Sequence, residues 1–487
     1  MERRNSHPES WCWATEDGRR WLTRLVVATL SPFGLTRGVG GETLRECFVR
    51  LGLETQVGCS PSALRGVMQA VEQAVGETTQ TWEQDGLAHG EVREILGGAD
   101  ETFLQRMLLV CQDVSTGSLL FEGVAEDRTD LTWKAGVDER LTALGTEGWS
   151  VVSDRASALI QRAEHGLVCL SMPDFFPLMH DLVQRASFAL ARQLRHAHQA
   201  LTHAEEGLAS HQALTPPAPD GPEATAQVAV RRAEGQRWEE AQRASRQHLE
   251  TLSRTFHPFD ISTALPQPSA QVARCLPAEV EAIEACAERH HVPARPGARK
   301  KICTQFPALA ALVDVWGQGV CRDVALFALP RVWRLWVHES LLPLVSWEHQ
   351  AARTRCARKK AKIVQALEAV RAAFDTHAIS QRLAPQVLAE WNAWATDRVN
   401  TFQRASSAVE GRHGSLAHMQ HNHRGLPKRR YKVWTVLHHF DWRASDGTTP
   451  AARFFRRPFP DLFETVFSHI AVLPRARQRR CEVGLGQ

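Results

Sequence analysis

The feature that most constrains the fold of this chain is a block of strand-like segments at residues 90–190. The block opens with a weak strand, EVREILGGAD, and a strong hairpin follows, RMLLVCQDVSTGSLLFEGVAED, which turns at DVSTGS. The helical stretch TDLTWKAGVDERLTAL, capped by Thr129 or Asp130, leads to a short buried strand, GWSVVSD, and to the helix ASALIQRAEHG. A fifth strand, LVCLSMP, precedes another helix. The order β-β-β-α-β-α-β-α predicts a mixed sheet with helices packed on it.

Helical segments flank this block. Residues 1 to about 85 include two amphipathic helices around a Gly-containing connector, with Ser60 as the cap and Pro61 in the first turn of the second helix. Residues 185 to about 400 are almost wholly helical in pattern, with breaks at LTPPAPDGPEA and HVPARPGARKK. We therefore expect an α/β fold in four parts, which are a helical N-terminal region (1–88), a first part of the sheet domain (89–190), a helical insertion (191–400) and the completion of the sheet domain (401–487).

Composition narrows the class of protein. With 487 residues, 43% hydrophobic and 23% charged, the chain should be globular and contain two to four structural units. A net charge of +4 is compatible with nucleic acid but does not demand it. The N-terminus has no apolar signal-peptide core and no apolar stretch reaches bilayer length, so we expect a cytoplasmic protein without a membrane partner. Eleven scattered cysteines without a C-x-x-C pair favour free thiols.

Three acidic residues occupy positions that suit a metal site. Asp100 and Asp154 end the strand-like runs GGAD and WSVVSD, and Glu410 lies in the helical segment SSAVEGRHG. Carboxylates on rigid elements bind Mg²⁺, and two such ions about 3.5–4 Å apart can activate an attacking hydroxyl and stabilise a leaving oxygen. Each residue also has a purely structural explanation. Asp100 could cap a turn, Asp154 could cap a helix, and Glu410 could complete a capping box with Ser407.

Other acidic and polar residues compete for these roles. Asp113 rivals Asp100 because MLLVCQD is the better strand, but Asp113 precedes Ser-Thr-Gly in the hairpin turn, where an Asp is expected on turn chemistry alone. Choosing Asp100 keeps a full hairpin before the first helix, so we favour it. Asp174 and His180 follow the fifth strand and are secondary candidates, with Asp174 expected mainly as a helix cap. Strand alternation should point Glu101 away from the face that carries Asp100.

The order of these motifs resembles the DDE transposases of bacterial insertion sequences. The likeness lies in ADETF on a first strand, a hairpin, VVSDRASAL on a fourth strand, and SSAVEGRHG after a long insertion, over roughly residues 90–190 and 400–440. It implies a ribonuclease H-like mixed sheet interrupted by a large all-α insertion and preceded by a helical N-terminal domain. The separation of Asp154 from Glu410 is far longer than in compact members and corresponds to such an insertion.

The resemblance also implies an activity. Asp100 and Asp154 would bridge two Mg²⁺ or Mn²⁺ ions, and Glu410 would bind the second ion. Such enzymes cleave double-stranded DNA at transposon ends and transfer the 3′-hydroxyl into target DNA, generally as homo-oligomers. A nucleoid-associated location in the bacterial cytoplasm follows. Two alternatives stay open: a catalytically inactive, transposase-derived DNA-binding protein, and a ribonuclease H-like nuclease that hydrolyses DNA without joining it.

Several segments are candidates for contact with DNA. The helix pair at 42–73 resembles a helix-turn-helix, although an ordinary helical hairpin explains it about equally well; its candidate contacts are Gln56, Ser62, Arg65 and Gln69. Two basic clusters, RTRCARKKAK at 353–362 and HRGLPKRRYK at 423–432, could neutralise phosphates. The second cluster adjoins Glu410, and the candidates in this region are Arg412, Arg424, Lys428, Arg429, Arg430 and Lys432. Four histidines lack cysteines at zinc spacing and are interpreted as polar or phosphate-contacting residues: His413, His418, His421 and His423.

Overall fold

The chain forms two compact units in a computed structural model. The structure describes residues 12–13, 15–89, 95–144, 149–154, 156–183, 187–213, 221–292, 298–402, 407–423, 430–444, 446–470 and 472–476. The first unit comprises Met1–Val151, Ala156–Leu170 and Ser406–Gln487, and the second comprises Val152–Arg155 and Ser171–Ala405. The second unit therefore lies, in sequence, between segments of the first.

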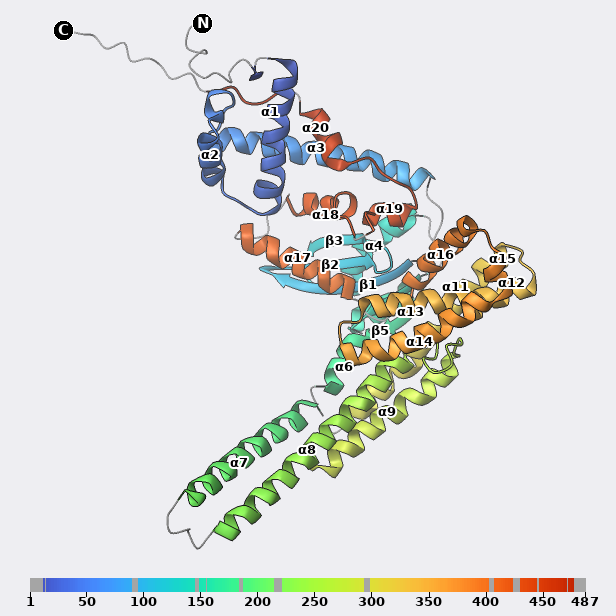
Figure 1. Cartoon of the computed structure of the whole chain (residues 1–487). Helices are drawn as coiled ribbons and strands as arrows, with labels where there is room; N and C mark the ends of the chain where they lie inside the picture. Colours follow the sequence, from blue (N-terminus) through green and yellow to red (C-terminus); the bar gives the residue numbers. More distant parts are fainter. Residues whose placement is uncertain are drawn as a thin grey trace, which may run out of the picture. The chain divides into compact units, whose positions relative to one another are not determined.

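Five strands form one mixed sheet in the order β3-β2-β1-β4-β5 (Figure 1). Their bounds are β1 Ile95–Leu104, β2 Arg106–Asp113, β3 Ser118–Ala125, β4 Trp149–Ser153 and β5 Leu170–Pro173. β1 pairs antiparallel with β2, and β2 pairs antiparallel with β3, so the predicted hairpin is confirmed. The predicted alternation of five strands with helices is confirmed as well.

The first strand differs from the prediction. β1 does not end at Asp100 but continues to Leu104 and turns through Gln105, whose φ of 60° lies in the left-handed region. The extension pairs residue by residue with the start of β2, and Asp100 lies opposite Val110. Sequence patterning ended the strand too early because the extension begins with two polar residues, Glu101 and Thr102. Asp100 therefore lies inside a strand rather than at its end.

The helices of the first unit come from both ends of the chain. They are α1 Glu16–Thr29, α2 Gly41–Arg50, α3 Pro61–His89, α4 Asp130–Leu144, α5 Ser157–Gln161, α17 Ser407–His423, α18 Arg430–Phe440, α19 Pro450–Phe455 and α20 Leu462–His469. The predicted caps are present: Ser60 Oγ accepts the Ala63 N–H at 3.2 Å, and Thr129 Oγ1 accepts the Thr132 N–H at 3.4 Å. α4 packs on one face of the strands, and α17 and α18 pack on the other (Figure 1).

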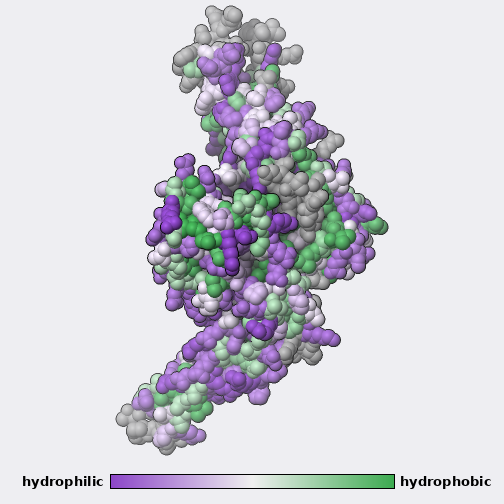
Figure 2. Space-filling view, turned by 90° about the vertical axis from the view of Figure 1, so that its right-hand side faces the viewer, coloured by the Kyte–Doolittle hydropathy of each residue, from purple (hydrophilic) through white to green (hydrophobic). Residues whose placement is uncertain are grey.

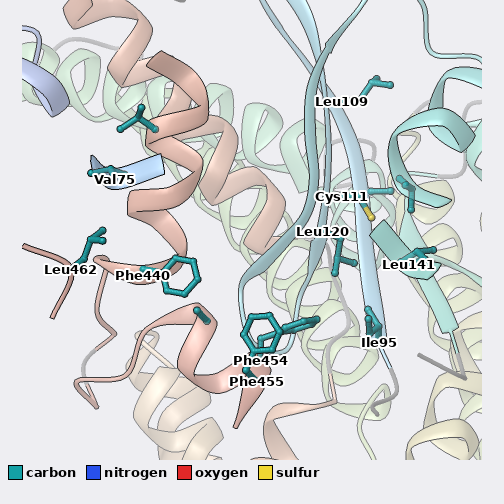
Figure 3. Packing of buried hydrophobic residues seen from close by; sticks show 14 of the residues in the cluster. Val75, Ile95, Leu109, Cys111, Leu120, Leu141, Phe440, Phe454, Phe455 and Leu462 are labelled. Atoms are coloured by element: carbon teal, nitrogen blue, oxygen red, sulfur yellow. The ribbon is translucent and has the colours of Figure 1, made fainter. Parts of the chain in front are cut away.

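One hydrophobic core joins the N-terminal helices, the sheet and the C-terminal helices of this unit. Val75 of α3, Leu109 and Leu120 of the hairpin, and Phe440 and Phe455 of the C-terminal helices belong to the same buried cluster (Figure 3). The predicted boundary at residue 88 falls at the end of α3, a helix whose buried residues belong to this core. Helical periodicity identified the helices correctly but could not show what their apolar stripes cover.

The second unit is helical apart from its short strand segments. Its helices are α6 Phe175–Leu182, α7 Phe188–Gln212, α8 Gly221–Thr255, α9 Ser269–Arg289, α10 Ala298–Cys303, α11 Phe306–Leu326, α12 Arg331–Trp336, α13 Leu342–Arg353, α14 Ala357–Thr376, α15 Ala378–Arg382 and α16 Pro385–Asn400. It has its own core, which includes Trp336, Trp347 and Phe374. Its long helices α7 and α8 pack side by side and present a mostly hydrophilic surface (Figure 2). The helical unit spans 171–405 rather than the predicted 191–400.

The described residues bear on two predictions, one about membrane-spanning helices and one about the cysteines. No helix in the described ranges combines the length and the apolar character needed to cross a membrane. Each cysteine in the part of the chain that the structure describes is a free thiol, as predicted.

Candidate functional site

Helix α17 lies over a row of three residues that crosses the antiparallel strands. Asp100 of β1 is paired with Val110 of β2, and Val110 is paired with Glu122 of β3. Residues in register across a sheet project from the same face, so all three side chains face α17. Asp100 and Glu122 thus lie two strands apart, a separation of roughly 10 Å. Both are on the sheet face covered by α17, the helix that carries Glu410.

Glu122 is the buried member of this row, and it binds Arg412 of α17. The guanidinium makes two bonds, Nε to Oε2 at 2.6 Å and Nη2 to Oε1 at 2.9 Å. Thr435 of α18 donates its hydroxyl to Oε1 at 2.6 Å. The side chains of Arg412 and Glu122 are 1% and 0% exposed. Arg412 was predicted to bind DNA; in the structure its guanidinium is buried and paired with Glu122.

Gly98, two residues before Asp100, explains why α17 can lie so close to β1. A Cβ placed on Gly98 would lie 2.9 Å from Cγ2 of Val409, the residue before Glu410, and 2.5 Å from Cγ1 of Val114. Only a residue without a side chain allows this packing, and such close approach is a common reason for glycine within a strand. The poor strand propensity of GGAD is therefore tied to the placement of α17.

His413 connects α17 to Asp100. Its Nδ1 lies 3.6 Å from Oδ2 of Asp100, and the two side chains are 13% and 27% exposed. Burial lowers the pKa of His413, so the ring is expected to be neutral near pH 7. Its Nε2 is buried and has no hydrogen-bond partner among the described residues. The proximity of His413 to Asp100 was not predicted from sequence.

The other two predicted metal ligands are at the surface. Glu410 is exposed in the first turn of α17. Asp154 is exposed and directly follows β4, as predicted. Within the described ranges, no group of three or more His, Cys, Asp or Glu side chains is close enough together to hold a metal ion. The predicted triad is therefore not a preassembled three-residue ligand set.

The secondary candidates have structural roles. Asp113 is 2% exposed, and its carboxylate accepts bonds from the hydroxyls of Ser115 and Thr116 and from the backbone N–H groups of Thr116 and Leu96, all within the hairpin and its neighbouring strand. Burial raises the pKa of Asp113. Asp113 therefore has the turn role that its sequence context predicts.

The residues after β5 also follow the structural interpretation. Asp174 caps α6 by accepting the Phe176 N–H at 2.7 Å. The Asp174 N–H in turn donates to the Ser153 carbonyl at 2.8 Å, which joins the ends of β4 and β5. His180 is exposed and stacks on Phe176, with ring centroids 6.2 Å apart.

The opposite face of β1 carries an open hollow rather than a second acidic site. Glu101 points to this face and pairs with Arg128, so the predicted alternation is confirmed. The hollow, about 1010 Å³, is lined by Phe103 and by both basic and acidic side chains, Arg106 and Arg128 with Glu126 and Asp127. This mixed charge gives no clear preference for an anionic ligand.

The structure describes only some of the residues predicted to contact DNA. Arg65 is exposed near the start of α3, but residues 51–60 separate α2 from α3, a longer connection than the roughly three- or four-residue turn of a helix-turn-helix. Lys432 is exposed in α18. Arg424, Lys428 and Arg429 lie outside the described residues, as does the side chain of Arg430. In the cluster at 353–362, Arg358 pairs with Glu250 of α8.

The comparisons with known proteins assign no activity. Residues 337–482 match a family of unknown function, DUF6399. The match covers less than a third of the chain and includes α17 and α18. No curated protein matches the sequence.

Sequence reasoning missed two residues that shape this site, Glu122 and Gly98, and it named His413 without linking it to Asp100. Two signals were available. Val409, Arg412 and Leu416 share one helical stripe, which marks Arg412 as inward-facing. Paired glycines within a strand indicate the close approach of another segment. The identity of Glu122 as the partner of Arg412 had no sequence signal, because 290 residues separate them.

Proposed function

We propose that this chain is a DDE-type transposase that catalyses metal-dependent strand cleavage and strand transfer of an insertion sequence. The observation that carries the proposal is the strand order β3-β2-β1-β4-β5, with Asp100 on β1, Asp154 directly after β4, and Glu410 on a helix that packs on β1. This arrangement is the one expected of a ribonuclease H-like domain. In this proposal the helical unit between β5 and α17 would be the expected insertion.

The chemistry of the acidic residues fits Mg²⁺ or Mn²⁺. All three supply carboxylate oxygens, the ligands these hard cations prefer. Asp100 is partly exposed and Glu410 and Asp154 are exposed, so solvent and DNA can reach each of them. Asp100 and Asp154 would hold both ions and Glu410 the second. The bound ions would supply activation of the attacking oxygen and stabilisation of the leaving oxygen. Because the carboxylates are not preassembled, the proposal requires them to draw together when DNA and metal bind.

Neighbouring residues of the chain would support this site. His413 would restrict the orientation of Asp100 from the α17 side, and its neutral ring would add no positive charge to compete with the ions. Arg65, Lys432 and the basic residues of segment 424–429 are the proposed contacts to phosphates of double-stranded DNA. A homo-oligomer acting on paired ends, within the nucleoid, completes the proposal.

The test uses the purified full chain and a supercoiled plasmid that carries the DNA flanking its own reading frame. We expect nicking, and then joining of 3′-ends to a second duplex, only with Mg²⁺ or Mn²⁺. Asp154→Asn and Glu410→Gln should each lower the cleavage rate at least about a hundredfold, because a metal contributes several kcal/mol to the transition state. Asp375→Asn, at an exposed carboxylate of α14, is the matched control and should leave the rate unchanged.

The possible outcomes separate the three functions. Cleavage without joined products would identify a ribonuclease H-like nuclease. DNA binding that is indifferent to Asp154 and Mg²⁺, with no cleavage, would identify an inactive DNA-binding protein. Equal cleavage rates for Asp154→Asn and the unaltered chain would show that the acidic site is assigned wrongly.

A further inference from the structure

The apolar contacts of α17 are too few to fix its orientation. Of its described side chains, Val409, Arg412 and Leu416 are buried. Their spacing places them on one stripe of the helix, with the arginine in the middle. Two apolar anchors hold the helix on the sheet, but hydrophobic contact is non-directional and leaves the helix able to roll about its axis.

The Arg412–Glu122 pair supplies the missing direction. Two parallel N–H···O bonds define the angle of approach as well as the distance, which a single contact cannot do. Thr435 binds the same carboxylate, so α17, β3 and α18 meet at one point. The side chains are 1% and 0% exposed, which shields their geometry from competition by water.

Stability alone is a poor explanation for this pair. Burying two charges carries a desolvation cost, and replacing a buried ion pair by apolar residues of similar volume is often neutral or stabilising. A leucine at 412 would extend the apolar stripe from Val409 to Leu416. An arginine at this position is better explained by the orientation that it imposes.

That orientation determines which side chains of α17 face β1. Successive helix residues are rotated by about 100°. With Arg412 directed at Glu122, His413 is turned toward Asp100, and Glu410 lies about 160° from Arg412, on the solvent side. The exposure of these side chains agrees with the helix geometry, since Arg412 is buried, the side chain of His413 is 13% exposed and Glu410 is exposed.

We infer that Arg412 and Glu122 are positioning residues that fix the rotation of α17 and so set the directions in which Glu410 and His413 project relative to β1. The effect on metal binding rests on the proposed function, whereas the effect on α17 does not. Neither residue touches the reacting groups.

The experiment compares the unaltered full chain with the double variant Arg412→Met/Glu122→Met and with Arg412→Lys, which keeps the charge but loses the two-point contact. Hydrogen exchange of α17 amides, measured without metal, should be at least about tenfold faster in the double variant, because local opening is easier when the helix is not held. Calorimetric Mn²⁺ binding should weaken about tenfold, as for other residues that orient metal ligands. Arg412→Lys should fall between the two chains in both measurements.

A second ion pair provides the control. Arg398 and Asp323 are 17% and 27% exposed and lie in the helical unit. The variant Arg398→Met/Asp323→Met should leave α17 exchange and Mn²⁺ affinity unchanged. Unaltered α17 exchange in a folded Arg412→Met/Glu122→Met chain would overturn the inference. Failure of both Arg412 variants to fold would overturn it as well, since the pair would then determine folding rather than orientation. If the unaltered chain binds no Mn²⁺, the proposed function fails, and the exchange data still decide the role of the pair.

Discussion

Gly98 and Gly97 allow a sharp test of how α17 is seated on β1. They are adjacent residues in the same strand, so alanine at either one has the same intrinsic effect on the strand. A Cβ at Gly97 would meet its nearest neighbours at 3.8–3.9 Å, which is ordinary contact. A Cβ at Gly98 would lie 2.9 Å from Val409 and 2.5 Å from Val114, so one of these side chains must move.

The two substitutions should therefore have opposite signs. Replacing a strand glycine by alanine gains roughly 0.5–1 kcal/mol when space allows, and Gly97→Ala should stabilise the first unit by about that amount. Overpacking typically costs roughly 1–3 kcal/mol, so Gly98→Ala should be destabilising by about 0.5–2 kcal/mol after the same gain is subtracted. The difference between the variants should be about 1–3 kcal/mol.

The measurement is hydrogen exchange of β1 and α17 amides as a function of urea, which reports on the first unit without interference from the second. Val409→Ala in the Gly98→Ala background removes the α17 side of the clash and should restore part of the loss. A Gly98→Ala chain as stable as Gly97→Ala would refute the claim that glycine at 98 is required for α17 to approach.

Two further predictions concern stability. Asp113→Ala should destabilise the first unit by about 2–4 kcal/mol, because it leaves buried donors of the turn unsatisfied; urea unfolding measures this, and a surface role for Asp113 would give almost no change. His438 is partly buried, and its desolvation lowers its pKa to about 4, so the unfolded chain takes up a proton below pH 6.5 that the folded chain resists. Stability should fall as pH drops from about 6.5 to 4, by about 3 kcal/mol from this residue. His438→Gln should flatten that pH profile, and an unchanged profile would contradict the assignment.

The sheet could be predicted from sequence because its strands are short, apolar and bounded by turn residues. Even β4, five residues long, was found from WSVVS. The end of β1 could not be found, because Glu101 and Thr102 are half-buried by pairing with β2, and such pairing leaves no mark on local composition. A local sequence pattern indicates which residues of a segment are buried, but it does not indicate which other segment packs against them.

The same limit applies to the candidate site. Asp100 and Asp154 were chosen from their positions in the strand pattern, and Asp113 was assigned to the hairpin turn, where it does bind Ser115 and Thr116. Arg412 was predicted to contact DNA together with the basic residues near Glu410, whereas its side chain is buried against a distant carboxylate. Two-point pairing between segments 290 residues apart can be read only from the folded chain.

The long separation of Glu122 from Arg412 in the sequence affects the order in which the chain folds. During synthesis at about 5–20 residues per second, β3 leaves the ribosome roughly 15–60 s before α17. During that interval Glu122 has no Arg412 to neutralise it, and the face of β1 and β2 that α17 will cover stays open to solvent and to other chains. The strands and the helical unit are all complete before α17 is made. A chain cut short before residue 407 would thus contain a folded helical unit attached to an uncovered, aggregation-prone sheet.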